Sequence, residues 1–381
     1  MAAKDKSIYE TFTIRSNDGS KTIDLRGGIV SFSYFENVFS PMITAQVLIT
    51  TTGNVIADED GDTTSIYNGL PLRGGEKVSF KIPANSENNV DLEFTEENGN
   101  ELYVASITNV LIEAEKEIFT LNLVSREAIT NETSRVGKKF PSSEPISDSV
   151  KEIIEKYLLS EKKVDVDETQ NPYGFLGNLK KPFTIITWLA AKSVPGNVGG
   201  KSATAGYFFF ETKEGYHFRS IDSLIDQPPY EIEYTYAPKI VDSQAADNDF
   251  KILSYSTTYN QNLIQNLERG AYCSYRMYYN PYSSTFTTPQ QGLFKVSDYA
   301  KDMQNLGKDF EIFLPPVDKK NESLGDVPSR YMTGVLDFGT LEKKEKRSNK
   351  KNADPMDYHS QAMMRYNTLF TLSLIHISEP T

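Results

Sequence analysis

The sequence predicts a β-rich α+β protein in which two mainly β regions flank a smaller α+β region. Short segments with alternating apolar and polar residues fill residues 7–127 and return in residues 226–371. Between them, residues 128–225 carry apolar residues at helical spacing and then two aromatic strand-like segments. A chain of 381 residues is long enough for two or three domains with sizeable cores.

The first region contains regularly spaced short strands. Val30, Phe32 and Tyr34 alternate with serines, and similar alternation occupies residues 43–49 and 78–82. Runs rich in Gly, Asn and Asp separate these segments, as expected for turns. Such spacing predicts a barrel or a sandwich.

Residues 119–158 mark the change from the first region to the second. Apolar residues alternate with polar ones from Phe119 to Leu123, which predicts a strand with one buried face. Residues 125–131 are then expected to form a polar bridge that ends the strand. Ser147 is the predicted N-cap of a helix whose apolar positions follow at i, i+3, i+4, i+7 and i+8 spacing: Val150, Ile153, Ile154, Tyr157 and Leu158.

The rest of the second region predicts one more helix and a hairpin. A helix starts at Pro182 and places Ile185, Trp188 and Leu189 on one face. The aromatic segments in residues 206–219 pair around a turn that contains Gly215. The sequence therefore predicts a compact α+β unit.

The third region predicts strands with short helices. Leu263, Ile264 and Leu267 lie on a helix closed by Gly270. Cys273, Tyr275, Met277 and Tyr279 then alternate along a strand that ends at Pro281. Ser297 is a candidate cap for a further helix with apolar residues at Tyr299, Ala300, Met303 and Leu306.

Composition narrows the classes of function. The net charge of −12 and the pI of about 5.0 give no general attraction to nucleic acid or to an anionic membrane. Cys273 is the only cysteine, so no intrachain disulfide forms, which suits assembly in a reducing cytoplasm. The N-terminal residues lack the apolar core of a signal peptide, and no run of about 18 apolar residues predicts a membrane span.

Residues 195–202 resemble a phosphate-binding loop but are one glycine short of it. Pro195 stands where the first glycine belongs, while Gly200, Lys201 and Ser202 match the end of the motif. A phosphate-binding loop joins a strand to a following helix. Here the predicted order is helix and then strand, so a flexible connection is the better interpretation.

The sequence predicts neither a catalytic site nor a metal or cofactor site. The three histidines, His217, His359 and His376, are far apart and have no metal-binding spacing. No serine lies in the Gly-x-Ser-x-Gly pattern of a nucleophile elbow. A glycosidase would need two carboxylates in a cleft, which spacing alone does not reveal. We therefore expect no enzymatic activity.

One local run is basic. Residues 342–352, which include Lys343 and Lys351, are rich in lysine. A solvated loop between strands is the first interpretation. Contact with an acidic partner or with passing DNA is the alternative, and the sequence does not decide between them.

Six segments, in order along the chain, resemble the central baseplate hub protein of T-even-like contractile-tailed phages, particularly of the cyanophage branch. They are residues 7–12, 66–76, 119–158, 215–222, 324–330 and 364–367. No single segment is specific, so the resemblance rests on the series.

The resemblance implies two tube-type antiparallel β-barrel domains, at residues 7–127 and 226–371, with an α+β insertion at 128–225. It implies a homotrimeric ring, assembled in the host cytoplasm for the virion tail baseplate, that adapts the sixfold tail tube to the threefold spike. The implied partners are the tail spike lysozyme protein and the tube and baseplate wedge proteins. DNA would pass only transiently through the lumen. A receptor- or glycan-binding tail protein is the alternative, although the single Trp argues mildly against it.

Residues 372–381 look like the translation of a transposase-type sequencing adapter. All ten residues, LSLIHISEPT, match one reading frame of such an adapter. We therefore leave them out of the fold prediction. The expectation that follows is an incomplete second barrel, whose last strands are missing.

Overall fold

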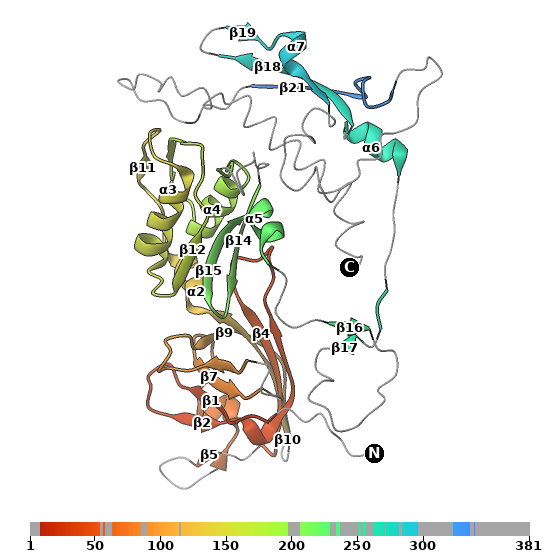
Figure 1. Ribbon diagram of the computed structural model, residues 1–381. Helices are drawn as coiled ribbons and strands as arrows, with labels where there is room; N and C mark the ends of the chain where they lie inside the picture. Colours follow the sequence, from red (N-terminus) through yellow and green to blue (C-terminus); the bar gives the residue numbers. More distant parts are fainter. Residues whose placement is uncertain are drawn as a thin grey trace.

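The structure is a computed structural model, and it describes residues 8–53, 56–57, 63–84, 90–113, 116–196, 206–228, 234–236, 251–252, 254–256, 262–270, 272–281, 284–295, 323–335 and 339 (Figure 1). The Ser297 helix, the basic run, His359, His376 and residues 364–381 lie outside the described residues. So do residues 197–202 of the loop that resembles a phosphate-binding loop.

The first part of the chain forms a large antiparallel sheet. Its elements are β1 (Thr11–Arg15), β2 (Thr22–Asp24), η1 (Arg26–Gly28), β3 (Ile29–Phe35), β4 (Thr44–Thr51), β5 (Ile56–Ala57), β6 (Thr63–Thr64), α1 (Ile66–Gly69), β7 (Lys77–Ile82), β8 (Leu92–Phe94), β9 (Leu102–Glu113) and β10 (Lys116–Ser125). Eight strands pair in the order β2-β1-β7-β9-β10-β4-β3, with β8 also on β7. The short pair β5–β6 stands apart from this sheet.

One face of the large sheet carries the core. Phe12, Phe80 and Phe94 are fully buried and stack in sequence, with ring centroids 5.3 and 5.0 Å apart. The inward residues of β4 and β10 complete the cluster. Each large apolar side chain buried in this way contributes about 1.5–3 kcal/mol. The alternation seen in the sequence therefore sets which face is buried.

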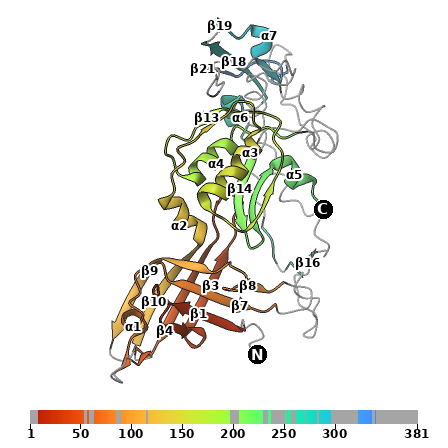
Figure 2. The same ribbon diagram turned by 90° about the vertical axis from the view of Figure 1, so that its left-hand side faces the viewer.

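The second part is an α+β unit. Its elements are α2 (Arg126–Thr133), β11 (Lys139–Phe140), α3 (Ile146–Ile153), η2 (Ile154–Leu158), β12 (Lys163–Val166), β13 (Phe175–Leu176), α4 (Pro182–Ala190), β14 (Tyr207–Thr212), β15 (Gly215–Ser220) and α5 (Ile221–Asp226). A three-stranded sheet has the order β12-β15-β14, with β12 parallel to β15. Helices α3 and α4 pack on it around a second buried cluster (Figure 2).

Three sequence predictions in this part are wrong. The polar bridge after β10 is helix α2, which buries Glu127 and Asn131. Ser147 lies inside α3, because the N-cap is Pro145 and the backbone N–H of Ser147 donates to Thr169 Oγ1 instead. Trp188 is 41% exposed, although Ile185 and Leu189, the other two residues of its predicted face, are buried as expected.

The third part contains β16 (Thr235–Tyr236), β17 (Lys251–Ile252), α6 (Leu263–Arg269), β18 (Cys273–Asn280), β19 (Thr285–Phe286), α7 (Pro289–Gly292), β20 (Leu293–Lys295) and β21 (Arg330–Val335). The predicted helix that ends at Gly270 and the predicted strand from Cys273 are both present. β18 pairs antiparallel with β19 and β20 but parallel with β21. This sheet is therefore mixed, unlike the predicted antiparallel barrel.

The fold is β-rich, with several antiparallel sheets, as predicted. The described residues do not form a closed barrel, because the end strands β2 and β3 of the large sheet pair only with β1 and β4. The domain boundaries after residues 127 and 225 stay predictions.

Candidate functional site

The outer face of the large sheet, on strands β3, β4, β10 and β9, carries no charged side chain over four successive cross-strand rows. Strand register places on it Ser31, Ser33, Phe35, Thr44, Gln46, Leu48, Thr50, Tyr103, Ser106, Thr108, Leu111, Ile118, Thr120, Asn122 and Val124. Charged residues make up 24% of the whole chain, so their absence from this set is a local feature. We call this surface the neutral face.

Polar side chains on the neutral face bond to one another across three strands. Gln46 Nε2 donates to Asn122 Oδ1 at 3.1 Å. The amide of Asn122 donates in turn to Ser106 Oγ at 3.0 Å and Thr108 Oγ1 at 3.3 Å. Because these groups satisfy one another, the face is polar without offering strong free binding groups.

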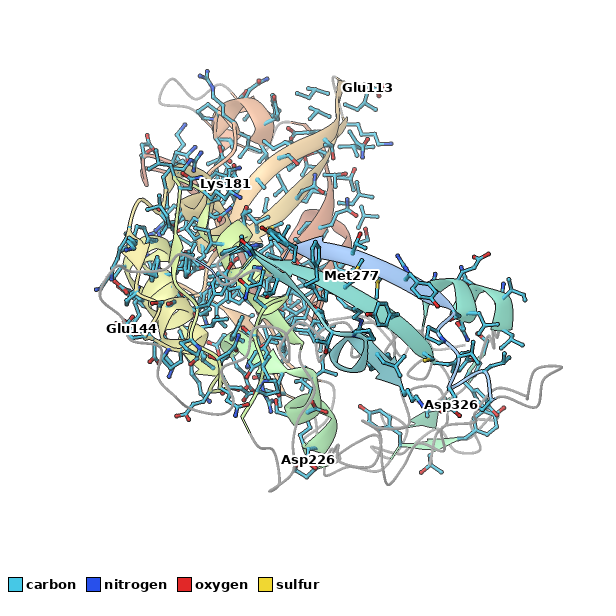
Figure 3. The ribbon with its side chains drawn as sticks, turned by 90° about the horizontal axis from the view of Figure 1, so that it is seen from above. Glu113, Glu144, Lys181, Asp226, Met277 and Asp326 are labelled. Atoms are coloured by element: carbon cyan, nitrogen blue, oxygen red, sulfur yellow. The ribbon has the colours of Figure 1, made fainter. Side chains whose placement is uncertain are left out.

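The β9–β10 hairpin extends from this face and exposes apolar residues near its end. Val110, Leu111 and Ile112 are 40%, 45% and 42% exposed. Glu113 marks the far end of β9 in the view from above (Figure 3). Three consecutive exposed apolar residues on a strand are typical of a surface that another chain covers.

The buried carboxylate of Glu117 fixes β10 close to the end of the hairpin, where Glu117 pairs with Ile112. It accepts hydrogen bonds from the backbone N–H groups of Ile66 and Tyr67, at 2.9 and 2.8 Å, and from Thr51 Oγ1 at 3.0 Å. Glu117 thereby ties β10 to α1 and to the end of β4.

Within the part of the chain that the structure describes, the two end strands of the large sheet are open on one side. β3 has exposed apolar residues at Val30 and Phe35. The sequence predicted that Val30 would share the buried face of Phe32, but a register shift between Ile29 and Ser31 leaves it exposed. An open strand edge with apolar residues is a template for pairing with another chain.

The third part also exposes apolar side chains on one side of its sheet. Phe286, Tyr331 and Val335 are exposed on β19 and β21, while Arg276 of β18 is buried. The rings of Tyr275 and Tyr331 lie 5.8 Å apart across the β18–β21 pair. This surface is a further candidate contact for a protein partner.

A buried ionic cluster joins the large sheet to the α+β unit. Lys162 Nζ lies 2.5 Å from Glu211 Oε1 and 2.9 Å from Glu127 Oε2. Glu211 also accepts from the backbone N–H of Ile43 at 2.9 Å and from Ser125 Oγ at 2.6 Å. We call Glu127, Lys162 and Glu211 the junction cluster.

Burial and charge act against each other in this cluster. Burial raises the pKa of Glu211 and outweighs the attraction of Lys162. Burial acts to raise the pKa of Glu127 as well, but Lys162 and Ser160 outweigh it and lower that pKa. For Lys162, burial acts to lower the pKa, but the two carboxylates raise it overall. The ammonium is therefore held in its charged form.

The junction cluster was not predicted from the sequence, although one signal was present. Tyr207, Phe209 and Glu211 occupy alternate positions of β14, and all three are buried. A carboxylate at a buried position of a strand requires a partner. The sequence gives no indication that this partner is Lys162.

His217 lies between a hydroxyl and a carboxylate, as the histidine of a hydrolase triad does. Its Nε2 lies 2.9 Å from Thr212 Oγ1, and its Nδ1 lies 3.4 Å from Asp165 Oδ2. A triad also needs free N–H donors beside the nucleophile to hold the oxyanion. Here the N–H of Lys213 donates to Glu36, and that of Glu214 donates to Thr212 Oγ1 itself. The arrangement is that of a tight, hydrogen-bonded turn.

The other candidate residues of the sequence do not come together. Cys273 is buried in β18. Within the described ranges, no group of three or more His, Cys, Asp or Glu side chains is placed to hold a metal ion. The helices in those same ranges include none that is long and apolar enough to span a membrane.

Comparisons with known proteins give likenesses of chain fold. No family model and no curated protein matches the sequence. A tail protein from Neisseria meningitidis MC58 aligns with 95% of this chain and 78% of its own, at 9% identity and a TM-score of 0.48. The 43 kDa tail protein of prophage MuSo2 from Shewanella oneidensis aligns over 55% of this chain, at 10% identity and a TM-score of 0.34.

A type VI secretion component from E. coli, described as structurally similar to T4 phage tail proteins, aligns over 56% of this chain at 10% identity and a TM-score of 0.30. This chain spans about half the length, 54%, of the Shewanella protein and 46% of the E. coli protein. At these identities and scores we take the likenesses as similarities of fold alone.

Proposed function

We propose that the chain is a structural subunit of a phage tail baseplate hub, in which three copies form a ring between the sixfold tail tube and the threefold spike. The neutral face is the observation that carries this proposal. A surface along which duplex DNA slides should not bind the phosphates, as Lys and Arg do by counterion release. It should not repel them either, as rows of Asp and Glu would.

The open edges of the large sheet support a ring. Among the described strands, β2 and β3 each leave one side unpaired, and β3 exposes Val30 and Phe35. A neighbouring copy that pairs with or covers these edges removes an aggregation risk. In a closed ring every copy contributes the same edges, so none is left over. The exposed apolar end of the β9–β10 hairpin provides further contact area.

We propose that the role is structural and involves no catalysis. The hydrogen-bonded turn around His217 and Thr212 lacks free oxyanion donors. The remaining function is then binding and geometry. The tube, wedge and spike proteins are the proposed partners, with the virion tail as the proposed location.

Glycan binding is the weaker alternative. A sugar-binding Trp usually offers an open ring face. Trp188 instead packs edge-on against Tyr173 and Phe175, and Lys192 Nζ lies over its ring at 5.1 Å from the centroid. The surroundings of Trp188, the only tryptophan, therefore favour packing over sugar stacking.

Sedimentation velocity tests the proposal directly. The protein should sediment as a trimer of its 42.9 kDa chain at micromolar concentration. The double variant Val30→Lys and Phe35→Lys puts charges on the β3 edge and should shift the population toward monomer. Ile129→Lys is the matched control, because Ile129 is an exposed apolar residue on α2 that should leave the trimer unchanged. A wild-type protein that stays monomeric contradicts the hub proposal.

A further inference from the structure

The large sheet and the α+β unit are two bodies with separate hydrophobic cores. One core lies on the large sheet, and the other lies between the helices and the small sheet of the α+β unit. The two bodies lie end to end (Figure 1, Figure 2). The chain passes from the first to the second at Ser125–Arg126, where β10 ends and α2 begins. Each body therefore keeps its own core if the contact between them breaks.

Apolar contact between the two bodies is modest among the described residues. Phe39 and Phe208 meet edge to face at 5.2 Å, but Phe39 is 77% exposed. Met42, just before β4, is partly buried against the core of the α+β unit. Beside these contacts, the backbone N–H of Lys213 donates to Glu36 Oε1 at 2.6 Å. Bodies joined by a small and partly polar contact are expected to move relative to each other.

Glu211 gives one carboxylate oxygen to each body. Its Oε1 lies 2.5 Å from Nζ of Lys162, which belongs to the same α+β unit. Its Oε2 accepts from the backbone N–H of Ile43 at 2.9 Å and from Ser125 Oγ at 2.6 Å, both on the side of the large sheet. The residue is fully buried. One side chain of the α+β unit therefore connects it to two points of the large sheet.

Each of these partners has another hydrogen bond to make when the bodies separate. Glu211 keeps Lys162, which moves with it, and the N–H of Ile43 becomes open to water. Ser125 is the N-cap residue of α2, yet its hydroxyl makes no capping bond. Once released from Glu211, this hydroxyl is free to accept from an N–H of the first helical turn, as N-cap serines do. Separation therefore avoids the cost of leaving a buried polar group without a partner.

We propose that the α+β unit is hinged on the large sheet, with Ser125–Arg126 as the hinge and Glu211 as the latch. In the closed state Glu211 joins β14 to the large sheet. In the open state the α+β unit changes its angle as one body, both cores stay packed, and Ser125 caps α2. A hinge needs only a few residues at the end of an element to change their backbone angles. The motion does not depend on the proposed place of the protein in a hub.

Hydrogen–deuterium exchange of the full chain tests the hinge. Two amides report on it from opposite bodies: that of Ile43, bonded to Glu211, and that of Lys213, bonded to Glu36. Because one opening breaks both bonds, the two amides should have the same protection factor. That factor should lie about tenfold or more below those of the amides in β7 and β15, which exchange only when a core opens. Reporter amides as well protected as these core amides would overturn the proposal.

Two variants test whether the two bonds break in one event. Glu211→Ala removes the acceptor of Ile43, and exchange should rise about tenfold at Lys213 as well. Glu36→Ala removes the acceptor of Lys213, and exchange should rise at Ile43 as well, by about threefold because Glu36 is exposed. Glu155→Ala is the matched control, since Glu155 is an exposed glutamate of the same unit, and it should leave both amides unchanged. A rise confined to the amide that lost its acceptor, or an equal rise in β7 and β15, would overturn the hinge.

Discussion

The carboxylate of Glu211 accepts a hydrogen bond from the backbone N–H of Ile43, which lies 168 residues earlier in the chain. The bond therefore joins β14 of the α+β unit to the residue just before β4 of the large sheet (Figure 1). Phe39 and Phe208 add an edge-to-face contact at 5.2 Å, and Glu36 accepts from the N–H of Lys213. The two parts are therefore connected by specific contacts as well as by the chain.

Loss of Lys162 should destabilise the protein strongly. The variant Lys162→Met keeps most of the side-chain volume but leaves two buried carboxylates, Glu127 and Glu211, without their cation. Breaking a buried pair from one side costs about 3–5 kcal/mol. Urea unfolding followed by the fluorescence of Trp188, the only tryptophan, measures this.

The control for that change is Lys156→Met. Lys156 pairs with Glu152 at 3.0 Å, but its side chain is 65% exposed. An exposed pair of this kind is worth only about 0.3–0.5 kcal/mol. A loss of similar size in both variants would mean that the junction cluster contributes no more than a surface pair.

The pH dependence of stability should change when Glu211 is replaced by Gln. The folded pKa of Glu211 is raised above its usual 4.5 by burial. Its contribution is therefore fully present below pH 4.5 and is lost as the pH rises through the folded pKa. Gln cannot ionise, so the variant should gain stability relative to the wild type as the pH rises through the folded pKa of Glu211.

The pH dependence of stability has the opposite sign for Glu127, whose folded pKa is lowered. Its contribution is present above its usual pKa of 4.5 and is lost as the pH falls through the folded pKa. Glu127→Gln should therefore lose stability relative to the wild type at neutral pH and approach it in acid. Urea unfolding at a series of pH values follows both variants. Parallel profiles for the wild type and both variants would contradict these assignments.

Local periodicity explains which elements could be predicted from the sequence. Strands β3, β4, β7, β10 and the β14–β15 hairpin were found because one buried face repeats every second residue. The neutral face could also have been read from the same strands, because the outward positions from Thr44 to Thr50 of β4 and from Ile118 to Val124 of β10 lack charges. Helix α2 was missed because its sequence is polar and its burial depends on Lys162, which comes 35 residues after Glu127.

Other features depend on chain segments that meet only in the fold. Leu179 adopts positive φ because residues 136–140 run beside it, and nothing within residues 176–181 predicts that except Gly177. The pairing of β18 with β21 brings Tyr275 against Tyr331 across more than fifty positions. Such long-range pairings have no local sequence signal.

Replacing Gly215 should disrupt the parallel pairing of β12 with β15. Gly215 has a φ of 139° and lies opposite Lys163, where an added Cβ would come 2.1 Å from Lys163 O. Both the backbone conformation and the space exclude a side chain. Gly215→Ala should therefore cost about 3 kcal/mol in unfolding free energy. Gly19→Ala is the control, since Gly19 has a φ of 72° but open space around it, and it should cost about 1–2 kcal/mol.

Substitution of His217 should affect stability and not reveal a catalytic role. His217 stacks on Phe210 at 5.0 Å and contacts Thr212. His217→Ala should lose about 1 kcal/mol of stability. The purified wild-type protein should show no turnover of peptidoglycan or of an activated ester. An activity that disappears in Thr212→Val and His217→Ala, with the fold intact by circular dichroism, would contradict the structural role.

Lysines placed on the neutral face should create DNA binding where the wild type has none. Gln46 and Ser106 lie in one cross-strand row, on either side of Asn122, and both are exposed. The double variant Gln46→Lys and Ser106→Lys should bind duplex DNA with an affinity that falls as salt rises. A plot of the logarithm of the binding constant against the logarithm of the salt concentration should have a slope of about −2. Fluorescence anisotropy with a labelled duplex measures this.

A control with two lysines placed elsewhere distinguishes an effect of the neutral face from an effect of the net charge. Thr22→Lys with Asn98→Lys adds two lysines at exposed positions away from the neutral face. Because the chain as a whole carries a net charge of −12, this control should bind DNA weakly or not at all. If the control binds as well as the neutral-face variant, the response reflects net charge alone. If the wild type itself binds DNA at physiological salt, DNA does not slide freely along the neutral face. The proposal that this face lines the path of the DNA is then wrong.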